Sequence, residues 1–317
     1  MDAELESLLT RILRENAVPI GDVEGTDEWV EQLRQYGVTA DGSQWRFEPE
    51  FERLSEAVVR SALSASASGW VSRLDVVPVI DSTNSALMAR ADQGSIDGMV
   101  LTAEIQAAGR GRRGRQWVAP VGGSLALSLG FDHIGSLSSL GGLSLVVGLA
   151  VADCLESHGV DGLALKWPND LLRADGKLAG ILVETVQAGP DVRVVIGIGL
   201  NLWGAETLSA SLARGVADLS DLPVAKRRNA LLAGLINTVY RYVRAYQTDG
   251  FAPMRQAWEA LNAHQDQVIA LDLGDRQVQG RMRGVDDHGA LLLETVGSNV
   301  ERYTGGEISL RAPEQTK

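Results

Sequence analysis

The residues best suited to chemistry lie in one short stretch. Four arginines and three glycines occupy the seven positions from Gly109 to Arg115, and Trp117 follows closely. Guanidinium groups stay charged and hold phosphate or carboxylate through paired hydrogen bonds, and glycines let the backbone approach a ligand. Because the whole chain has a formal net charge of −12, we expect a loop that repels itself when empty and closes over a bound anion.

The same stretch satisfies the spacing G-x-G-x-x-G of dinucleotide-binding proteins. In those proteins the glycines open a helix whose N-terminus faces a pyrophosphate. Here the following segment, 116–123, contains Pro120 and two more glycines and is typical of a loop. We therefore reject a dinucleotide-binding interpretation.

Polar side chains also occur where three apolar, strand-like segments begin or end. Lys166–Asp170 (Lys-Trp-Pro-Asn-Asp) ends one of them, because Pro168 interrupts strand pairing. Lys177 precedes the second, and Gly197–Asn201 ends the third with two glycines and an amide. A single lysine in such a place usually faces only solvent. Two lysines, amides, a carboxylate and the arginine loop on one sheet indicate a site for an anionic ligand such as a nucleotide.

Composition limits the class of protein. A chain of 317 residues, 45% of them hydrophobic, is long enough for two or three packed domains. Cys154 is the only cysteine and the four histidines share no metal-ligand spacing. We therefore expect no disulfide and no metal held by protein side chains, so that Mg²⁺ would arrive with a nucleotide.

The N-terminus and the hydropathy pattern indicate the cellular compartment in which we expect the protein. Met1–Glu4 is acidic where a signal peptide needs positive charge, and the most apolar run, 145–152, is much shorter than the roughly 20 residues of a membrane span. With a single cysteine, these features predict a cytoplasmic protein without membrane association.

Strand and helix patterns alternate through the middle of the chain. Strands are expected at 70–80, 99–105, 124–131, 163–167, 180–186 and 192–198, and helices at 81–91, 141–158, 229–248 and 253–261. Residues 61–69 have the composition of a linker or the tail of a short helix. Four short strands separated by glycine turns between 268 and 303 predict a small β-barrel.

The N-terminal fifty residues have the outline of an abbreviated winged helix. Helical spacing at 5–13 and 26–36 is followed by a hairpin at 38–47 with the turn signal Asp41-Gly42. Residues 1–50 contain four basic and twelve acidic side chains, a net charge of −8. Because phosphate neutralisation supplies much of the affinity for DNA, we expect a packing or regulatory unit in preference to an operator-binding domain.

Five motifs in this order resemble those of biotin protein ligases, over about residue 70 to the C-terminus. They are Asp81–Asn84, Gln106–Arg115, Lys166–Asp170, Lys177–Glu184 and Gly305–Arg311. The N-terminal unit makes the chain similar to the bifunctional ligase/repressor type. The resemblance implies an α+β fold with a central mixed β-sheet packed with helices, as in class II synthetases. It also implies a winged-helix-like unit (1–60), a catalytic domain (66–265) and an SH3-like C-terminal barrel (266–317).

The resemblance implies two half-reactions. The biotin carboxylate attacks the α-phosphate of ATP to form biotinyl-5′-AMP, and a lysine of the biotin carboxyl carrier protein of acetyl-CoA carboxylase then attacks the anhydride. Carboxylate and triphosphate repel each other, so the reaction needs fixed positive charge and positioning. The implied catalytic residues are Lys177, Arg112 and Asp170. Lys177 would bridge the carboxylate and the α-phosphate, and Asp170 would orient a lysine or act as a base.

Ligand contacts are implied by the same resemblance. The biotin-binding residues would be Ser82, Thr83, Asn84, Gln106, Arg110, Gly111, Arg112 and Lys177. The residues binding ATP and the adenylate would be Arg112, Arg115, Trp117, Asn169, Asn201 and Arg311, with Mg²⁺ accompanying the nucleotide.

Three alternatives stay open at this point. A lipoate–protein ligase would use the same acyl-adenylate chemistry with a substrate that lacks the ureido ring. A repressor of biotin synthesis with biotin as corepressor would depend on the acidic N-terminal unit. A binding module without catalysis is disfavoured by the intact Lys177 and arginine loop. The resemblance further suggests a homodimer formed through the central sheet.

Overall fold

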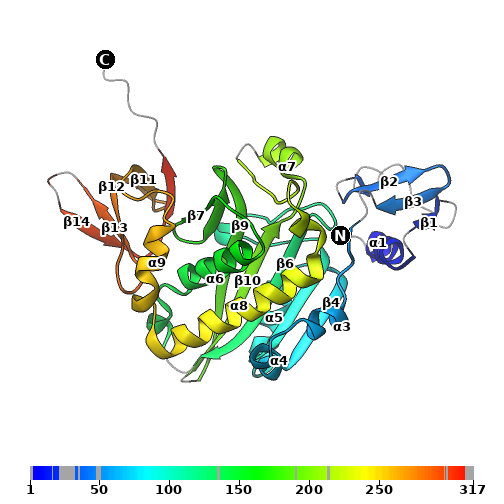
Figure 1. The fold of residues 1–317 in the computed structure, drawn as a ribbon, viewed down its shortest axis with the longest axis horizontal. Coiled ribbons are helices and arrows are strands. Elements are labelled where there is room, and N and C mark those ends of the chain that lie inside the picture. Colours follow the sequence, from blue (N-terminus) through cyan, green and yellow to red (C-terminus); the bar gives the residue numbers. More distant parts are fainter. Residues whose placement is uncertain are drawn as a thin grey trace, which may run out of the picture.

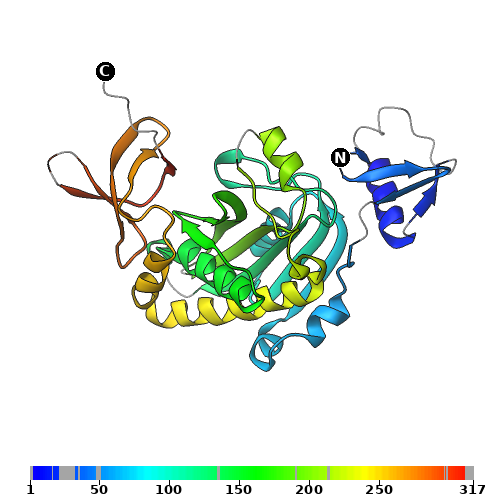
Figure 2. The same cartoon turned by 45° about the horizontal axis from the view of Figure 1, so that its top comes forward.

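The computed structural model describes residues 3–15, 17–20, 33–34, 36–47, 51–133, 136–189, 191–212, 215–295, 297 and 299–310. Three sheets follow one another along the chain, with three, seven and five strands. Figures 1 and 2 show the first and last at opposite ends of the central one. A large mixed sheet with helices and a small antiparallel C-terminal sheet confirm the expected α+β class. The domain boundaries at 60/66 and 265/266 stay predictions.

The central sheet has the strand order β4-β5-β6-β10-β9-β8-β7. Its strands are β4 (Arg73–Ile80), β5 (Met99–Gln106), β6 (Ser124–His133), β7 (Leu163–Lys166), β8 (Asp170–Arg173), β9 (Gly176–Ala188) and β10 (Asp191–Asn201). β4 and β5 are parallel, and every other pair of neighbours is antiparallel. The parallel pair is joined through a helix, as a crossover between parallel strands requires.

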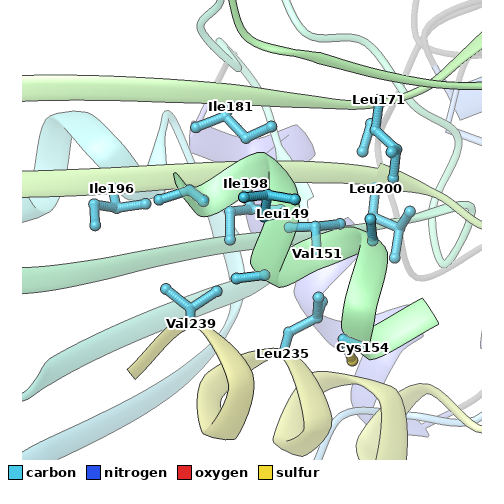
Figure 3. Close-up of a cluster of buried hydrophobic side chains, with 14 of the residues drawn as sticks. Leu149, Val151, Cys154, Leu171, Ile181, Ile196, Ile198, Leu200, Leu235 and Val239 are labelled. Carbon is cyan, nitrogen blue, oxygen red and sulfur yellow. The ribbon is translucent and has the colours of Figure 1, made fainter. Parts of the chain in front are cut away.

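Helices cover both faces of this sheet. They are α5 (Thr83–Gln93) on one face and α6 (Leu143–Ser157) with α8 (Arg228–Asp249) on the other. Side chains alternate between the faces of a strand. Accordingly, Val194 and Ile196 of β10 lie in the core beneath α6 and α8, whereas Val195 packs with Leu87 and Ala91 of α5. Figure 3 shows α6 between the sheet and α8, with Leu149 and Val151 among the side chains that fill this core.

Helix α6 is apolar around its whole circumference. By length and composition, Leu137–Ser157 is the one helical segment of the described chain that could cross a membrane. In the fold, however, eleven residues of α6 are buried, and the helix packs on α8 and on the sheet. A helix that is apolar all round is expected in the centre of a large core, which is the place of α6 here.

Several elements differ from the sequence-based expectation. Strand β9 begins at Gly176, so that Lys177 lies within a strand and does not merely precede one. Asp170 opens β8, a four-residue strand that the polar sequence around it concealed. The structure also contains helix α7 (Ala205–Leu212), which we did not expect.

Most of the segment 61–69 is helical, in agreement with the short helix that we gave as the alternative to a linker. Helices α3 (Glu56–Ser61) and α4 (Ala65–Trp70) follow each other, and the Ser64 side chain caps α4 by accepting from the backbone N–H of Ala67. Trp70 and Ala67 are buried, and Trp70 stacks on Phe131 with ring centroids 4.5 Å apart. The Ser64 cap and burial against the central core therefore stabilise the helix in this stretch.

The N-terminal unit contains α1 (Ala3–Glu15), β1 (Ala17–Pro19), β2 (Val38–Asp41) and β3 (Gln44–Phe47), with the sheet order β1-β3-β2. The helix at 5–13 and the hairpin at 38–47 are thus confirmed, whereas most of the helix expected at 26–36 falls outside the described residues. The unit shares its apolar cluster with Ile105 and Val121 of the central unit. It therefore packs on residues that flank the arginine loop in the sequence.

The C-terminal unit is a five-stranded antiparallel sheet. Its strands are β11 (Val268–Asp272), β12 (Gln277–Val285), β13 (Leu291–Glu294), β14 (Val300–Tyr303) and β15 (Glu307–Leu310), in the order β14-β13-β12-β11-β15. Strand β15 was not among the four expected strands. Helix α9 (Arg255–Ala260) precedes the unit, and hydrogen bonds between Leu165 of β7 and residues 261 and 263 tie its start to the central sheet.

A buried ion pair anchors the segment that enters the central unit. Arg228, at the start of α8, lies 2.7 Å from the Glu104 carboxylate, and the two side chains are 1% and 6% exposed. Arg228 also donates to the backbone oxygen of Glu52, and Glu104 accepts from the backbone N–H of Leu54. The pair therefore joins α8, β5 and the incoming chain.

Arg228→Ala is expected to lower the free energy of unfolding by about 3–5 kcal/mol, because it leaves the Glu104 carboxylate buried without its counter-charge. Equilibrium urea unfolding measures the loss. The matched control is Arg241→Ala. Arg241 pairs with Asp153, and the two side chains are 66% and 41% exposed. Loss of this exposed pair should cost no more than about 1 kcal/mol. Equal losses in the two variants would contradict the anchoring role.

Candidate active site

Two adjoining pockets lie beside the arginine loop. Five residues line both: Gly111, Arg112, Trp117, Asn169 and Lys177. A ligand in one pocket would therefore meet a ligand in the other beside a lysine and an arginine.

The first pocket collects the residues predicted to bind biotin. It is lined by Ser82, Thr83, Asn84, Gln106, Arg110, Gly111, Arg112 and Lys177, together with residues of β9 and β10. Ser82 caps α5 by accepting from the backbone N–H of Ser85, so the helix start places its polar residues at the end of β4. Gln106 ends the neighbouring strand β5, and its Oε1 accepts from the backbone N–H of Thr83 at 2.9 Å.

The second pocket contains most of the residues predicted to bind the nucleotide. Arg112, Arg115, Trp117 and Asn169 line it, with Lys166, Asp170, Lys177 and Glu307. Asn201 lines neither pocket. Its amide instead donates to the backbone oxygens of Lys177 and Ala217, both at 3.1 Å. Arg311 lies outside the described residues. The ligand contacts of all these residues stay predictions.

Each guanidinium group of the loop contacts a protein oxygen. Arg110 forms a bidentate pair with Glu184, at 2.7 and 3.1 Å, and Arg112 donates to Asn169 Oδ1 at 3.0 Å. Arg113 donates to the backbone oxygen of Asp272 at 3.3 Å, and Arg115 pairs with Glu307. We expected mutual repulsion to keep the loop open without an anion. Instead carboxylates and carbonyls from other elements, two of them in the C-terminal unit, balance the four charges.

Arg112 is the loop arginine most enclosed by the site. Burial lowers the pKa of its guanidinium, and Glu307, which raises it, is the largest opposing effect. An arginine with a lowered pKa is still charged at neutral pH. Desolvation instead strengthens its attraction for an anion, because the effective dielectric constant falls.

Neighbouring groups fix both the side chain and the backbone of Lys177. Its Nζ lies 2.6 Å from Asp170 Oδ1 and 5.8 Å from the centre of the Trp117 ring. Its backbone forms a parallel bridge with Val216, donating to the oxygen of Gly215 at 3.0 Å and accepting from Ala217 at 3.0 Å. The ammonium group is therefore directed to the junction of the two pockets.

The Trp117 ring lies on a floor of glycines. Gly180 of β9 and Gly199 of β10 are cross-strand partners, and a Cβ on Gly199 would lie 2.4 Å from the ring. A Cβ on Gly180 would lie 3.0 Å from Lys177 Nζ. The indole nitrogen is buried without a hydrogen-bond partner in the described chain. Gly199, the second glycine of the Gly197–Asn201 motif, thus makes room for Trp117.

Sequence reasoning missed one fully buried polar residue of the site, Ser128 of β6, which contacts Thr83 and Asn84. The only available signal was a serine within the otherwise apolar strand 124–131. Within the described ranges no cluster of three or more His, Cys, Asp or Glu side chains could hold a metal ion.

Sequence comparisons place this site in a known class. The profile of the biotin/lipoate A/B protein ligase family matches residues 76–201, which include the first four motifs. The profile of the biotin protein ligase C-terminal domain matches residues 266–311. These two matches place the central and C-terminal segments of the chain in the class of biotin/lipoate protein ligases.

Individual relatives narrow the class. The bifunctional ligase/repressor BirA of Escherichia coli is 36% identical over 290 residues, covering 90% of this chain and 88% of that protein. The biotin–[acetyl-CoA-carboxylase] ligase of Mycobacterium tuberculosis is 37% identical over 265 residues, with coverages of 81% and 96%. The structure of biotin protein ligase from Aquifex aeolicus in complex with biotin and ATP aligns with a TM-score of 0.63 and 25% identity, over 76% of this chain and 99% of that one. The chain belongs to the biotin protein ligase family and is a ligase.

Gly199→Ala is expected to displace Trp117 and with it the arginine loop, because real Cβ atoms do not approach a ring to 2.4 Å. Limited trypsin digestion should then cleave between Arg110 and Arg115 several-fold faster than in the wild type. Gly94→Ala is the matched control, since a Cβ there meets nothing within 4 Å. An unchanged cleavage rate in Gly199→Ala would contradict the glycine floor as the support of the loop.

Proposed function

We propose that this protein attaches biotin to a lysine of the biotin carboxyl carrier protein of acetyl-CoA carboxylase, through ATP-dependent formation of biotinyl-5′-AMP. The observation that carries the proposal is the junction of two pockets at Lys177 and Arg112. One pocket is lined by polar groups around a glycine-rich strand pair, and six charged side chains contribute to the lining of the other. The names of the relatives and the biotin and ATP in the Aquifex aeolicus structure support the same assignment.

In the first half-reaction, biotin occupies the first pocket with its carboxylate directed at Lys177. A carboxylate oxygen attacks the α-phosphorus of ATP, and the bond to the bridging oxygen breaks as pyrophosphate leaves. Lys177 and Arg112 balance the charge of the approaching anions, and electrostatic stabilisation of this kind is often the largest catalytic effect. Mg²⁺ would be bound by the phosphates.

In the second half-reaction, an uncharged lysine amine of the carrier attacks the acyl carbon. An amide forms, the acyl C–O bond breaks, AMP leaves with the electron pair and the amine loses a proton to solvent. Asp170 lies 2.6 Å from Lys177 Nζ, which supports an orienting role for this carboxylate over that of a base. Trp117 and the arginine loop would exclude water from the anhydride.

Nucleotide binding would rearrange the loop contacts. Arg115 pairs with Glu307 at the wall of the second pocket. Triphosphate oxygens are stronger competitors for a guanidinium than a single carboxylate, so ATP would replace Glu307 at Arg115. Asn201 and Arg311 are proposed as further nucleotide contacts, the former after exchange of its bonds to Lys177 and Ala217.

We also propose a cytoplasmic location and a homodimer, which the family resemblance implies. For operator binding, the net charge of −8 on residues 1–50 is unfavourable. We therefore propose that the N-terminal unit acts mainly through its packing on Ile105 and Val121.

Incubation of the purified protein with biotin, Mg-ATP and a carrier domain tests the function. The intact mass of the carrier should increase by one biotinyl group, and omission of ATP should abolish the change. Excess lipoate should not compete, because it lacks the ureido ring. Modification of the carrier by lipoate in place of biotin would favour the lipoate-ligase alternative.

Lys177→Ala is expected to slow adenylate formation by roughly 10²–10³-fold, the usual cost of removing one group that stabilises the transition state. Pyrophosphate release in the absence of carrier measures this step. Lys226→Ala is the control, since Lys226 is exposed and lines neither pocket. Urea unfolding establishes that both variants are folded, and a wild-type rate in Lys177→Ala would remove this residue from the mechanism.

A further inference from the structure

Lys166 is a cation of the second pocket without a counter-charge. The charged side chains that line this pocket are Arg112, Arg115, Lys166, Lys177, Asp170 and Glu307. Both carboxylates are engaged, Asp170 by Lys177 at 2.6 Å and Glu307 by Arg115. Within the described ranges, Lys166 forms no ion pair and no side-chain hydrogen bond, although its side chain is half-buried.

The pocket consequently has an excess of positive charge. The guanidinium group of Arg112 contacts only neutral oxygens, Asn169 Oδ1 at 3.0 Å and the backbone oxygen of Gly306 at 3.5 Å. Together with Lys166, it leaves two cations uncompensated. Charges that are taken out of water are costly unless an opposite charge pairs with them, so an anionic ligand would be stabilised by both groups.

The position of Lys166 follows from the strand order. Lys177 lies on β9, Asp170 on β8 and Lys166 on β7, and these three strands are neighbours in the sheet. Lys166 is the cross-strand partner of Asp170, so the two side chains extend from the same face. Because neighbouring strands are about 5 Å apart, Lys166 lies beyond Asp170 as seen from Lys177, on the side away from the first pocket.

This position decides which part of ATP Lys166 can meet. The biotin carboxylate must reach the α-phosphorus, which therefore lies at the junction of the pockets, beside Arg112 and Lys177. Lys166 lines only the second pocket, so it meets either the nucleoside or the β- and γ-phosphates. The nucleoside is uncharged and would leave the half-buried ammonium group unpaired, whereas phosphate oxygens form strong charge-assisted hydrogen bonds with it.

We propose that Lys166 binds the β- and γ-phosphates of ATP and the pyrophosphate that leaves. The inference rests on the proposed function and adds a residue to its first half-reaction. When a carboxylate oxygen attacks the α-phosphorus, the bond from this phosphorus to the α–β bridging oxygen breaks, and its electron pair goes to pyrophosphate. Lys166 stabilises the charge that develops on this leaving group. It does not act in the second half-reaction, because pyrophosphate has already left.

Lys166→Met tests this division between the half-reactions, since it keeps an unbranched side chain and removes the charge. Release of pyrophosphate from biotin and Mg-ATP, without carrier, should be roughly 10–100-fold slower, the effect of losing one hydrogen bond to a charged group. When synthetic biotinyl-5′-AMP replaces biotin and ATP, transfer to the carrier domain should proceed at the wild-type rate. Wild-type transfer also establishes that the variant is folded.

The reverse reaction measures the contact with pyrophosphate directly. Biotinyl-5′-AMP and magnesium pyrophosphate are supplied, and the ATP formed is measured. Lys166→Met should raise the KM for pyrophosphate by about tenfold or more and leave the KM for biotinyl-5′-AMP unchanged, because the AMP half does not meet Lys166. An unchanged KM for pyrophosphate would overturn the proposal.

Lys226→Met is the matched control, because it makes the same substitution at an exposed lysine that lines neither pocket. It should behave as the wild type in all three assays. Slower transfer from biotinyl-5′-AMP in Lys166→Met would mean that Lys166 contacts AMP or the carrier, or has a structural role, and it too would contradict the inference. Failure of the wild type to release pyrophosphate or to modify the carrier would instead overturn the proposed function.

Discussion

The structure depends on how concentrated positive charge is balanced in an acidic protein. Four guanidinium groups within seven residues repel one another, and Lys177 adds a fifth cation at the same site. Glu184 on β9, Asp170 on β8, and Asp272 and Glu307 in the C-terminal unit supply the counter-charges. Because each pair joins the loop or Lys177 to a different element, the same ion pairs hold the loop in position and hold the C-terminal unit against it. Anionic substrates would compete for the same cations, which couples ligand binding to these contacts.

The two faces of the central sheet differ in role: one packs against the core helices and the other carries the site. The face beneath α6 and α8 is filled with branched apolar side chains, and the α5 face of the same strands carries glycines where the site lies. Alternation along β10 places Ile196 and Ile198 on one side and Gly197 and Gly199 on the other. The missing side chains leave room for Asn84 and Trp117, so this pair of strands supports the arginine loop from below.

The fold was largely predictable because its strongest signals are local. The helical spacing of α1, α6 and α8, the hairpin of the N-terminal unit and the alternation in β6 were identified near their observed bounds. Short elements were not. Strand β8 has four residues and begins with a polar one, and the composition of α4 suits a linker as well as a short helix, between which the Ser64 cap and the burial of Ala67 and Trp70 decide. Strand β15 was noticed as a motif and not as a strand.

The sequence by itself determined which chemical groups are available: an arginine-rich loop, Lys177 and Asp170 at strand ends, and the ordered motifs of one ligase family. Only the tertiary structure decided which carboxylate meets which cation, that Asn201 supports Lys177, and that Ser128 and Glu184 belong to the site. The physical reason is that hydrogen bonds and ion pairs act over a few ångströms, between residues up to 194 positions apart, and no local pattern records such distances.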